Sequence, residues 1–334
     1  MRFIKVFVMI LLVQLSYCSS GGVQGSDDKN VKLKPNFAMP HISKGRAYAK
    51  MKQYKKAIAS FTRAVEIDPK EIRAYYSRGL LYVQLNMYAR AIYDFTQMIK
   101  IDPKEKTAYY LRGVVYRFID SYKQAIQDFN RVIELDSKFV NAYYERGIVY
   151  LNLNELEKAK ADFNKTIELA PKMHYAYYFK GIINLREKNY QEGINNFTQA
   201  IKLNPKFLLA YLDRGTAKFY MSQFKKAIKD FTKAIKINPK SYTAYIRRGI
   251  THAARKKYKK AIKDYSKAIK IDPKYYLGYF RRGVTYSIRK KYKKAVKDYT
   301  RAIKRNPNIA EIYQNRGEAY DKLGKHKKAI KDFD

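Results

Sequence analysis

Four histidines and a periodic set of aspartates are the side chains of this sequence that could support catalysis or metal binding. His41, His174, His252 and His326 lie far apart, and no two of them have the spacing that metal ligands need. The aspartates recur at 34-residue intervals with one gap, as Asp94, Asp128, Asp162, Asp230, Asp264, Asp298 and Asp332. Such recurrence is typical of a structural role, and the sequence contains no Gly-rich phosphate-binding loop. We therefore predict no enzymatic activity, no metal site and no cofactor.

Lysines form a second set of candidate functional side chains, because they could bind an anion. The chain has 70 Lys and Arg against 29 Asp and Glu, a net charge of +41, and residues 201–334 hold 38 of the basic but only 10 of the acidic residues. At helical spacing, the lysines of residues 225–236 fall opposite the apolar residues of that segment. The basic-face candidates are Lys225, Lys226, Lys229, Lys233, Lys236, Lys259, Lys260, Lys263, Lys293, Lys294 and Lys297. An anionic surface or an acidic polymer would fit this face, and a merely solvated face in a lysine-rich composition is the alternative.

These side chains belong to a sequence that repeats every 34 residues. The segment AYYSRG at 74–79 returns as AYYLRG at 108–113 and as AYYERG at 142–147. The segment YARAIYDF at 88–95 returns as YKKAVKDY at 292–299. A proline closes most repeats, at positions 69, 103, 171, 205, 239, 273 and 307, with Ser137 as the exception. A fixed period of this length indicates a solenoid of stacked helical units.

Each repeat contains two helical patterns. Tyr75, Gly79 and Tyr82 fall at i, i+4 and i+7, which is one face of a helix, and the same spacing recurs within residues 91–98. A short linker separates the two patterns, and the Asp-Pro at 102–103 ends the second, because proline cannot continue a helix interior. The repeat is therefore expected to be a helical hairpin.

Residues 38–334 resemble the tetratricopeptide repeat family. Aromatic, Gly, Tyr, Ala, Phe, Ala and Pro residues recur in this order at the family's spacing, although Tyr stands where that family often has Trp. The resemblance implies an all-α fold, a right-handed superhelical solenoid of antiparallel helix pairs. Eight full units are expected at 38–71, 72–105, 106–139, 140–173, 174–207, 208–241, 242–275 and 276–309, with a partial ninth at 310–334. Solenoids normally end in a polar capping helix. The sequence shows none after the ninth unit, so we expect either that the chain is truncated or that its last unit frays.

The resemblance also implies a groove that the first helix of each unit lines. The matching positions are Tyr76, Tyr110, Tyr144, Tyr178, Leu212, Ile246 and Phe280, each one residue beyond a residue expected in the core. Aromatic side chains in such a column would suit an apolar peptide or a partner helix, and packing within the solenoid is the alternative. Co-chaperone members of the family bind a C-terminal carboxylate with a Lys and an Asn, but here Tyr76 with Leu80 and Tyr110 with Val114 take those places. That clamp is therefore absent.

The first residues differ from the repeats. Residues 1–18 combine early positive charge with an apolar run from Val6 to Leu15, which at about 1.5 Å per residue is too short to span a bilayer. This pattern predicts a secretory signal peptide. Residues 19–37 are rich in Gly, Asp and Ser and are expected to form a flexible polar linker.

The only cysteine of the chain follows the apolar run directly. Bacterial lipoproteins carry their lipidated residue at this point, and Leu15 and Ser16 match their pattern, whereas Tyr17 does not. Lipid attachment at Cys18 and ordinary cleavage after Cys18 or Ser20 are both open. The chain is thus expected to be exported to the periplasm, the outer membrane or the extracellular space, with or without a lipid anchor.

An arginine before most of the periodic glycines leads to a further structural prediction. The residues are Arg78, Arg112, Arg146, Arg214, Arg248, Arg282 and Arg316. We expect them to pair with the periodic aspartates between helices, as a partly buried ladder. Because exposed ion pairs contribute only about 0–1 kcal/mol each, the value of the ladder would lie in fixing the stacking register.

These features together predict a non-enzymatic protein–protein interaction scaffold of the cell envelope or secretory space. Its partner, a peptide or a helix of another protein, would bind in the groove. The alternative is an adaptor for a polyanion or an anionic membrane surface, acting through the lysine-rich outer face of units six to eight. Nucleic acid is not expected, because an exported chain rarely meets it and no nucleic-acid-binding motif is present.

Overall fold

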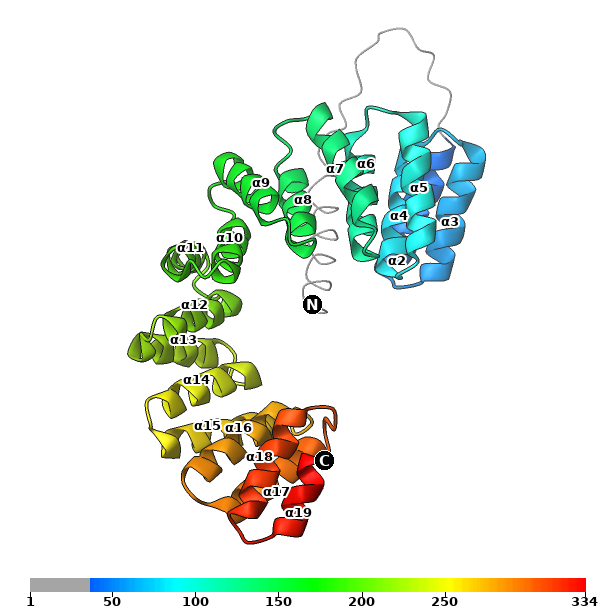
Figure 1. Cartoon of the computed structure of the whole chain (residues 1–334). Helices are drawn as coiled ribbons and strands as arrows, with labels where there is room; N and C mark the ends of the chain where they lie inside the picture. Colours follow the sequence, from blue (N-terminus) through cyan, green and yellow to red (C-terminus); the bar gives the residue numbers. More distant parts are fainter. Residues whose placement is uncertain (1–36) are drawn as a thin grey trace. The chain divides into compact units, whose positions relative to one another are not determined.

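The computed structural model describes residues 37–334, which form eighteen α-helices and no strands (Figure 1). The predicted all-α fold is confirmed. The predicted signal peptide, Cys18 and the linker up to residue 36 lie outside the described residues. None of the described helices is both long enough and apolar enough to span a lipid bilayer.

The helices are arranged as consecutive antiparallel pairs in two compact units, of which the first ends at Leu169 and the second spans Ala170–Asp334. The first unit contains α2 (Ala38–Lys50), α3 (Tyr54–Ile67), α4 (Ile72–Gln84), α5 (Tyr88–Ile101), α6 (Lys106–Phe118), α7 (Tyr122–Leu135), α8 (Val140–Asn152) and α9 (Leu156–Leu169). The second contains α10 (His174–Arg186), α11 (Tyr190–Leu203), α12 (Leu208–Tyr220), α13 (Phe224–Ile237), α14 (Tyr242–Ala254), α15 (Tyr258–Ile271), α16 (Tyr276–Ile288), α17 (Tyr292–Ile303), α18 (Ala310–Asp321) and α19 (His326–Phe333).

A residue in the left-handed conformation turns the chain between the two helices of each pair. The positions are Lys52, Asn86, Asp120, Asn154, Lys188, Ser222, Lys256, Lys290 and Gly324, with φ between 55° and 71°. The amide that follows bonds back to the first helix, as Gln53 N does to the Tyr48 carbonyl at 2.9 Å, which is the helix-ending motif that satisfies orphan carbonyls. This turn makes the linker as short as the sequence suggests.

An Asx turn separates one pair from the next. The side chain of Asp68, at the end of α3, accepts a hydrogen bond from the backbone N–H of Lys70 at 3.0 Å, across Pro69. Asp102, Asp136, Asn204, Asn238 and Asp272 make the equivalent bond. The Asp or Asn before most prolines therefore stabilises the turn in which each repeat ends.

The core of each pair is built around a glycine and an aromatic ring sixteen residues later. A Cβ added at Gly79 would lie 2.6 Å from the Phe95 ring, and one added at Gly215 would lie 2.6 Å from the Phe231 ring, so only glycine lets the ring approach. Alanines of the second helix, such as Ala91, are fully buried beside this contact.

Within each compact unit, pairs stack because a second helix also packs on the first helix of the next pair, as α3 does on α4 and α13 on α14. First helices of neighbouring pairs touch as well, as α4 touches α2 and α14 touches α12. Within each compact unit, the first helices therefore lie toward one face of the stack and the second helices toward the other.

Candidate functional site

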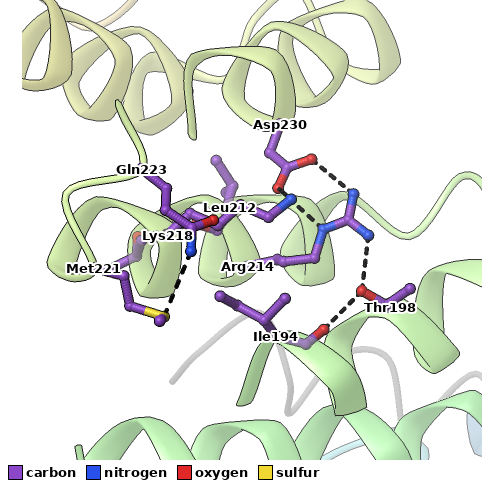
Figure 2. A network of polar contacts seen from close by, with 9 residues as sticks. Ile194, Thr198, Leu212, Arg214, Lys218, Met221, Gln223 and Asp230 are labelled. Atoms are coloured by element: carbon purple, nitrogen blue, oxygen red, sulfur yellow. Dashed lines mark hydrogen bonds and ion pairs between the residues drawn. The ribbon is translucent and has the colours of Figure 1, made fainter. Parts of the chain in front are cut away.

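An arginine–aspartate ladder joins neighbouring helices, and this prediction is confirmed. Arg78 on α4 donates from Nε and Nη2 to the carboxylate of Asp94 on α5, at 3.0 and 2.8 Å, and from Nη1 to Thr62 on α3 at 3.0 Å. The same bidentate pair recurs at 112/128, 146/162, 214/230, 248/264, 282/298 and 316/332. Figure 2 shows the pair of Arg214 and Asp230, with Thr198 as the third partner. Each guanidinium thus contacts three successive helices.

Burial and pairing act in opposite directions on the ladder. Burial raises the pKa of Asp94, Asp128 and Asp162, against the lowering effect of the arginine that each one binds. Burial lowers the pKa of the partner arginines, but the bound carboxylates raise it further, so the net shift of Arg78, Arg112 and Arg146 is upward. The unit that begins at His174 has Lys180 and Asn196 at the ladder positions, so the bidentate pair is not repeated there.

The predicted groove column lies mostly in the interior. Tyr110, Tyr178, Leu212, Ile246 and Phe280 are buried, whereas Tyr76 and Tyr144 are half-buried. Ring contacts with the second helix of the same pair account for much of this burial: Tyr110 lies 6.3 Å from Phe129, Tyr178 5.8 Å from Phe197 and Phe280 6.1 Å from Tyr299, between ring centroids. These five side chains are packing residues, which favours the packing alternative for them. A ligand-binding role for the column stays a prediction.

All eleven basic-face candidates are exposed, and we call them the basic surface. They lie on α13, α15 and α17. Among the described residues, the only acidic side chains on these three helices are Asp230, Asp264 and Asp298, and the ladder arginines bind all three. The lysines therefore have no carboxylate on their own helix to pair with.

Three of the four second helices of the first compact unit differ at matching positions. There a cation is paired with a glutamate three residues later: Arg63 with Glu66 at 3.1 Å on α3, and Lys165 with Glu168 at 2.6 Å on α9. α7 repeats the arrangement with Arg131 and Glu134, whereas α5 has Gln97 and Lys100. On α13 and α15 the corresponding pairs are Lys233 with Lys236 and Lys267 with Lys270. Lysine thus stands on both helices where α3, α7 and α9 have the compensating glutamate.

Comparison with family sequence models settles the class of repeat. A model described as tetratricopeptide repeat matches residues 72–105, 140–173, 209–241, 242–275 and 276–309. Related models match residues 45–86 and 120–154, 174–207, and 298–331. This chain belongs to the tetratricopeptide repeat family. Membership supports a role as a protein-interaction scaffold.

Solved tetratricopeptide and related structures share the fold. A tetratricopeptide repeat protein from Parabacteroides merdae is 18% identical with a TM-score of 0.58, over 74% of this chain and 98% of that one. A chain of the APC/C hetero-tetramer Cut9–Hcn1 is 16% identical with a TM-score of 0.57, over 85% and 56%. The type IV pilus biogenesis factor PilW is 16% identical with a TM-score of 0.53, over 58% and 90%. No curated protein sequence matches the chain.

One tetratricopeptide position varies in a way that bears on the site. Six units carry a tyrosine at the eleventh position of the repeat, namely Tyr48, Tyr82, Tyr116, Tyr150, Tyr286 and Tyr320. The three units between carry Asn184, Lys218 and His252. Lys218 turns to the ladder and donates to Asp230 at 2.8 Å, as Figure 2 shows. At the eleventh position of the repeat, polar side chains thus replace an aromatic ring in the three units in the middle of the array.

A buried ion pair on the first helices escaped prediction. Arg117 on α6 and Glu145 on α8 lie 2.7 Å apart and are almost completely buried, and burial raises the pKa of Glu145. Neither residue recurs at its repeat position, so the periodic pattern that reveals the ladder contains no sign of this pair.

The ladder yields a stability prediction. Asp128→Asn is expected to lower the free energy of unfolding by about 3 kcal/mol, because it leaves the buried Arg112 charge without its carboxylate. Glu134→Gln, which breaks the exposed pair with Arg131 on the same helix, is the control and should cost less than about 1 kcal/mol. Urea unfolding followed by circular dichroism measures both. Equal losses in the two variants would show that the ladder is no more important than a surface pair.

Proposed function

We propose that this tetratricopeptide protein is a non-enzymatic scaffold that binds an acidic protein segment through the basic surface. The observation that carries the proposal is the replacement of the paired glutamate by lysine on α13 and α15, at the position where α3, α7 and α9 keep their ion pairs. A surface that serves only solubility can carry lysines and glutamates together, so the absence of glutamates on these helices indicates a further role. Family membership supports a protein as the partner.

The energetics of the helices support the same proposal. Lys225, Lys229 and Lys233 follow one another at i and i+4 on α13, and like charges at this spacing destabilise a helix by about 0.2–0.5 kcal/mol per pair. The folded protein therefore carries a repulsion that a partner of opposite charge would relieve. Electrostatic complementarity of this kind also accelerates association at low salt.

A peptide bound to the face of first helices is a second candidate function, and exposed apolar side chains favour it. Leu209 and Tyr220 on α12 are 38% and 58% exposed, and Ile288 on α16 is 55% exposed. These residues, rather than the buried column, offer an apolar contact surface to a peptide or a partner helix.

A charge reversal on α13 tests the proposed function. Lys225→Glu with Lys229→Glu and Lys233→Glu is expected to weaken binding of labelled poly-glutamate by about tenfold or more, since attraction becomes repulsion. The matched control changes Lys55, Lys70 and Lys104, exposed lysines of the first compact unit, to Glu, with the same change in net charge. Fluorescence anisotropy measures the affinity at about 0.05 M and about 0.5 M NaCl, where screening should abolish the difference.

Three outcomes would count against this assignment. Equal weakening in both variants would mean that net charge alone drives binding. Unchanged affinity in the α13 variant would remove the basic surface from the function. Stronger binding to anionic vesicles or to RNA than to poly-glutamate would reassign the class of partner.

A further inference from the structure

A hollow of about 750 Å³ opens between α14 and α15, and Lys260 and Lys263 of the basic surface help to line it. Arg248 and His252 line it from α14, and Lys260, Lys263, Lys267 and Lys270 line it from α15. The volume lies within the range of about 300–1,000 Å³ that is typical of sites for small ligands.

His252, which lines the hollow, takes the place of the tyrosine of six other units. The unit that begins at Val140 has a hollow at the equivalent place, but its volume is only about 390 Å³. There Tyr150 lines the wall, and its ring lies under Lys158, with the ammonium nitrogen 5.4 Å from the ring centroid. An imidazole is smaller than a phenol ring, so its substitution widens the space between the two helices.

The two hollows also differ in charge. The smaller one includes Glu134 in its lining and has Ala161 where the larger one has Lys263. In the larger one Arg248 binds a carboxylate and a hydroxyl: Nε and Nη2 donate to Asp264 at 2.9 and 2.7 Å, and Nη1 donates to Thr232 at 3.1 Å. Arg248 and Asp264 therefore neutralise each other, and four lysine ammonium groups remain to set the charge of the hollow.

His252 contributes its imidazole ring to the wall. Its Nδ1 is buried and makes no hydrogen bond among the described residues, while Nε2 lies 3.9 Å from the Asp264 carboxylate. Burial lowers the pKa of His252, which favours the neutral ring. The lysines, not the histidine, therefore give the hollow its charge.

We propose that this hollow binds a soluble, multiply charged phosphate compound. Lys260, Lys263, Lys267 and Lys270 all lie on α15, and this row of cations along one wall calls for several negative charges on one ligand. Lysine serves phosphate as a point charge, whereas carboxylate recognition favours the free fork of an arginine, and Asp264 already occupies the Nε–Nη2 edge of the only arginine here. The inference deepens the proposed function by assigning a small ligand to one place at the basic surface.

Isothermal titration with inorganic tripolyphosphate tests the proposal on the whole chain. We expect one site per chain and an affinity for tripolyphosphate about tenfold or more above those for inorganic phosphate and tetraglutamate. Tripolyphosphate can contact more of the lysines than inorganic phosphate can, and it offers phosphate groups where tetraglutamate offers carboxylates. His252→Tyr keeps every lysine and restores the residue of the other units, so it should fold and should weaken tripolyphosphate binding by about tenfold. Vesicles with phosphorylated lipid headgroups, tested in parallel, should bind no more tightly than tripolyphosphate.

Matched variants distinguish binding in the hollow from non-specific attraction of the ligand to the positively charged surface. Lys263→Ala and Lys267→Ala should weaken binding, whereas Lys240→Ala, at an exposed lysine outside the hollow, should not. Tyr150→His in the smaller hollow, which lacks the lysine cluster, should create no second site. Several weak sites per chain that His252→Tyr leaves unchanged would overturn the proposal, and so would tighter binding of tetraglutamate or of the vesicles. Because poly-glutamate binding should be normal in His252→Tyr, failure here is distinguishable from failure of the proposed function.

Discussion

Replacing Phe231 with alanine is expected to lower the free energy of unfolding by about 3–5 kcal/mol, the usual cost of removing a large ring from a core. Phe231 is 1% exposed and packs directly on Gly215, where no other residue could admit it. Because Gly215 has no side chain to move into the space, the cavity that the substitution leaves cannot easily be filled. Lys233→Ala, at an exposed position on the same helix, is the control and should stay within about 0.5 kcal/mol of the parent.

The loss should also be local. In a repeat protein each pair of helices is stabilised by its neighbours, so the damage should decline with distance along the array. Hydrogen exchange in Phe231→Ala is expected to rise most in α12, α13 and α14 and least in α2 to α5. A uniform rise over all helices would show that the array unfolds as one cooperative unit and would contradict the nearest-neighbour account.

Features that recur along the array could be predicted from the sequence. An arginine before the periodic glycine and an aspartate sixteen residues after that arginine appear in seven of the nine units, so one geometric hypothesis had seven occurrences to support it. The hairpin and the ladder follow from this recurrence. The left-handed residue between paired helices could not be recognised by type, because Lys, Asn, Asp and Ser share the position and only the ninth unit has Gly.

Features that depend on a single unit could not be predicted in this way. Whether a ring of the groove column is buried depends on the residue that precedes the next unit. Phe139 covers Tyr110 at 5.2 Å and Phe207 covers Tyr178 at 5.0 Å, between ring centroids, whereas Glu105 holds the corresponding place for the half-buried Tyr76. That position varies from unit to unit, so the repeat pattern carries no information about it.

The hollow beside His252 illustrates the same limit. From the sequence, His252 is a histidine without metal-ligand spacing, and the lysines form a solvated or anion-binding face. Only the three-dimensional arrangement shows that the histidine borders a hollow and that four lysines of α15 line the same hollow. A comparison of each unit with the others, position by position, would have revealed the exchange but not the volume.

Burial also changes what a mutation in the groove column can reveal. Because Tyr110 is buried, a loss of partner binding in Tyr110→Ala could follow from unfolding and would not identify a ligand contact. The half-buried Tyr76 and Tyr144 are better probes of binding, provided that the melting temperature of each variant is measured alongside.

Tyr110 and its neighbour Tyr109 therefore provide a decisive contrast in stability. Tyr110→Ala is expected to lower the free energy of unfolding by about 3–5 kcal/mol, because its ring is 6% exposed and fills the space between Phe129 and Phe139. Tyr109→Ala should cost only about 1–2 kcal/mol, since its ring is half-buried and its hydroxyl donates to the Pro103 carbonyl at an exposed edge. Urea unfolding of the two variants measures the difference. If Tyr109→Ala lowered the stability more than Tyr110→Ala, Tyr109 would be the core residue, and Tyr110 would again be a candidate ligand contact.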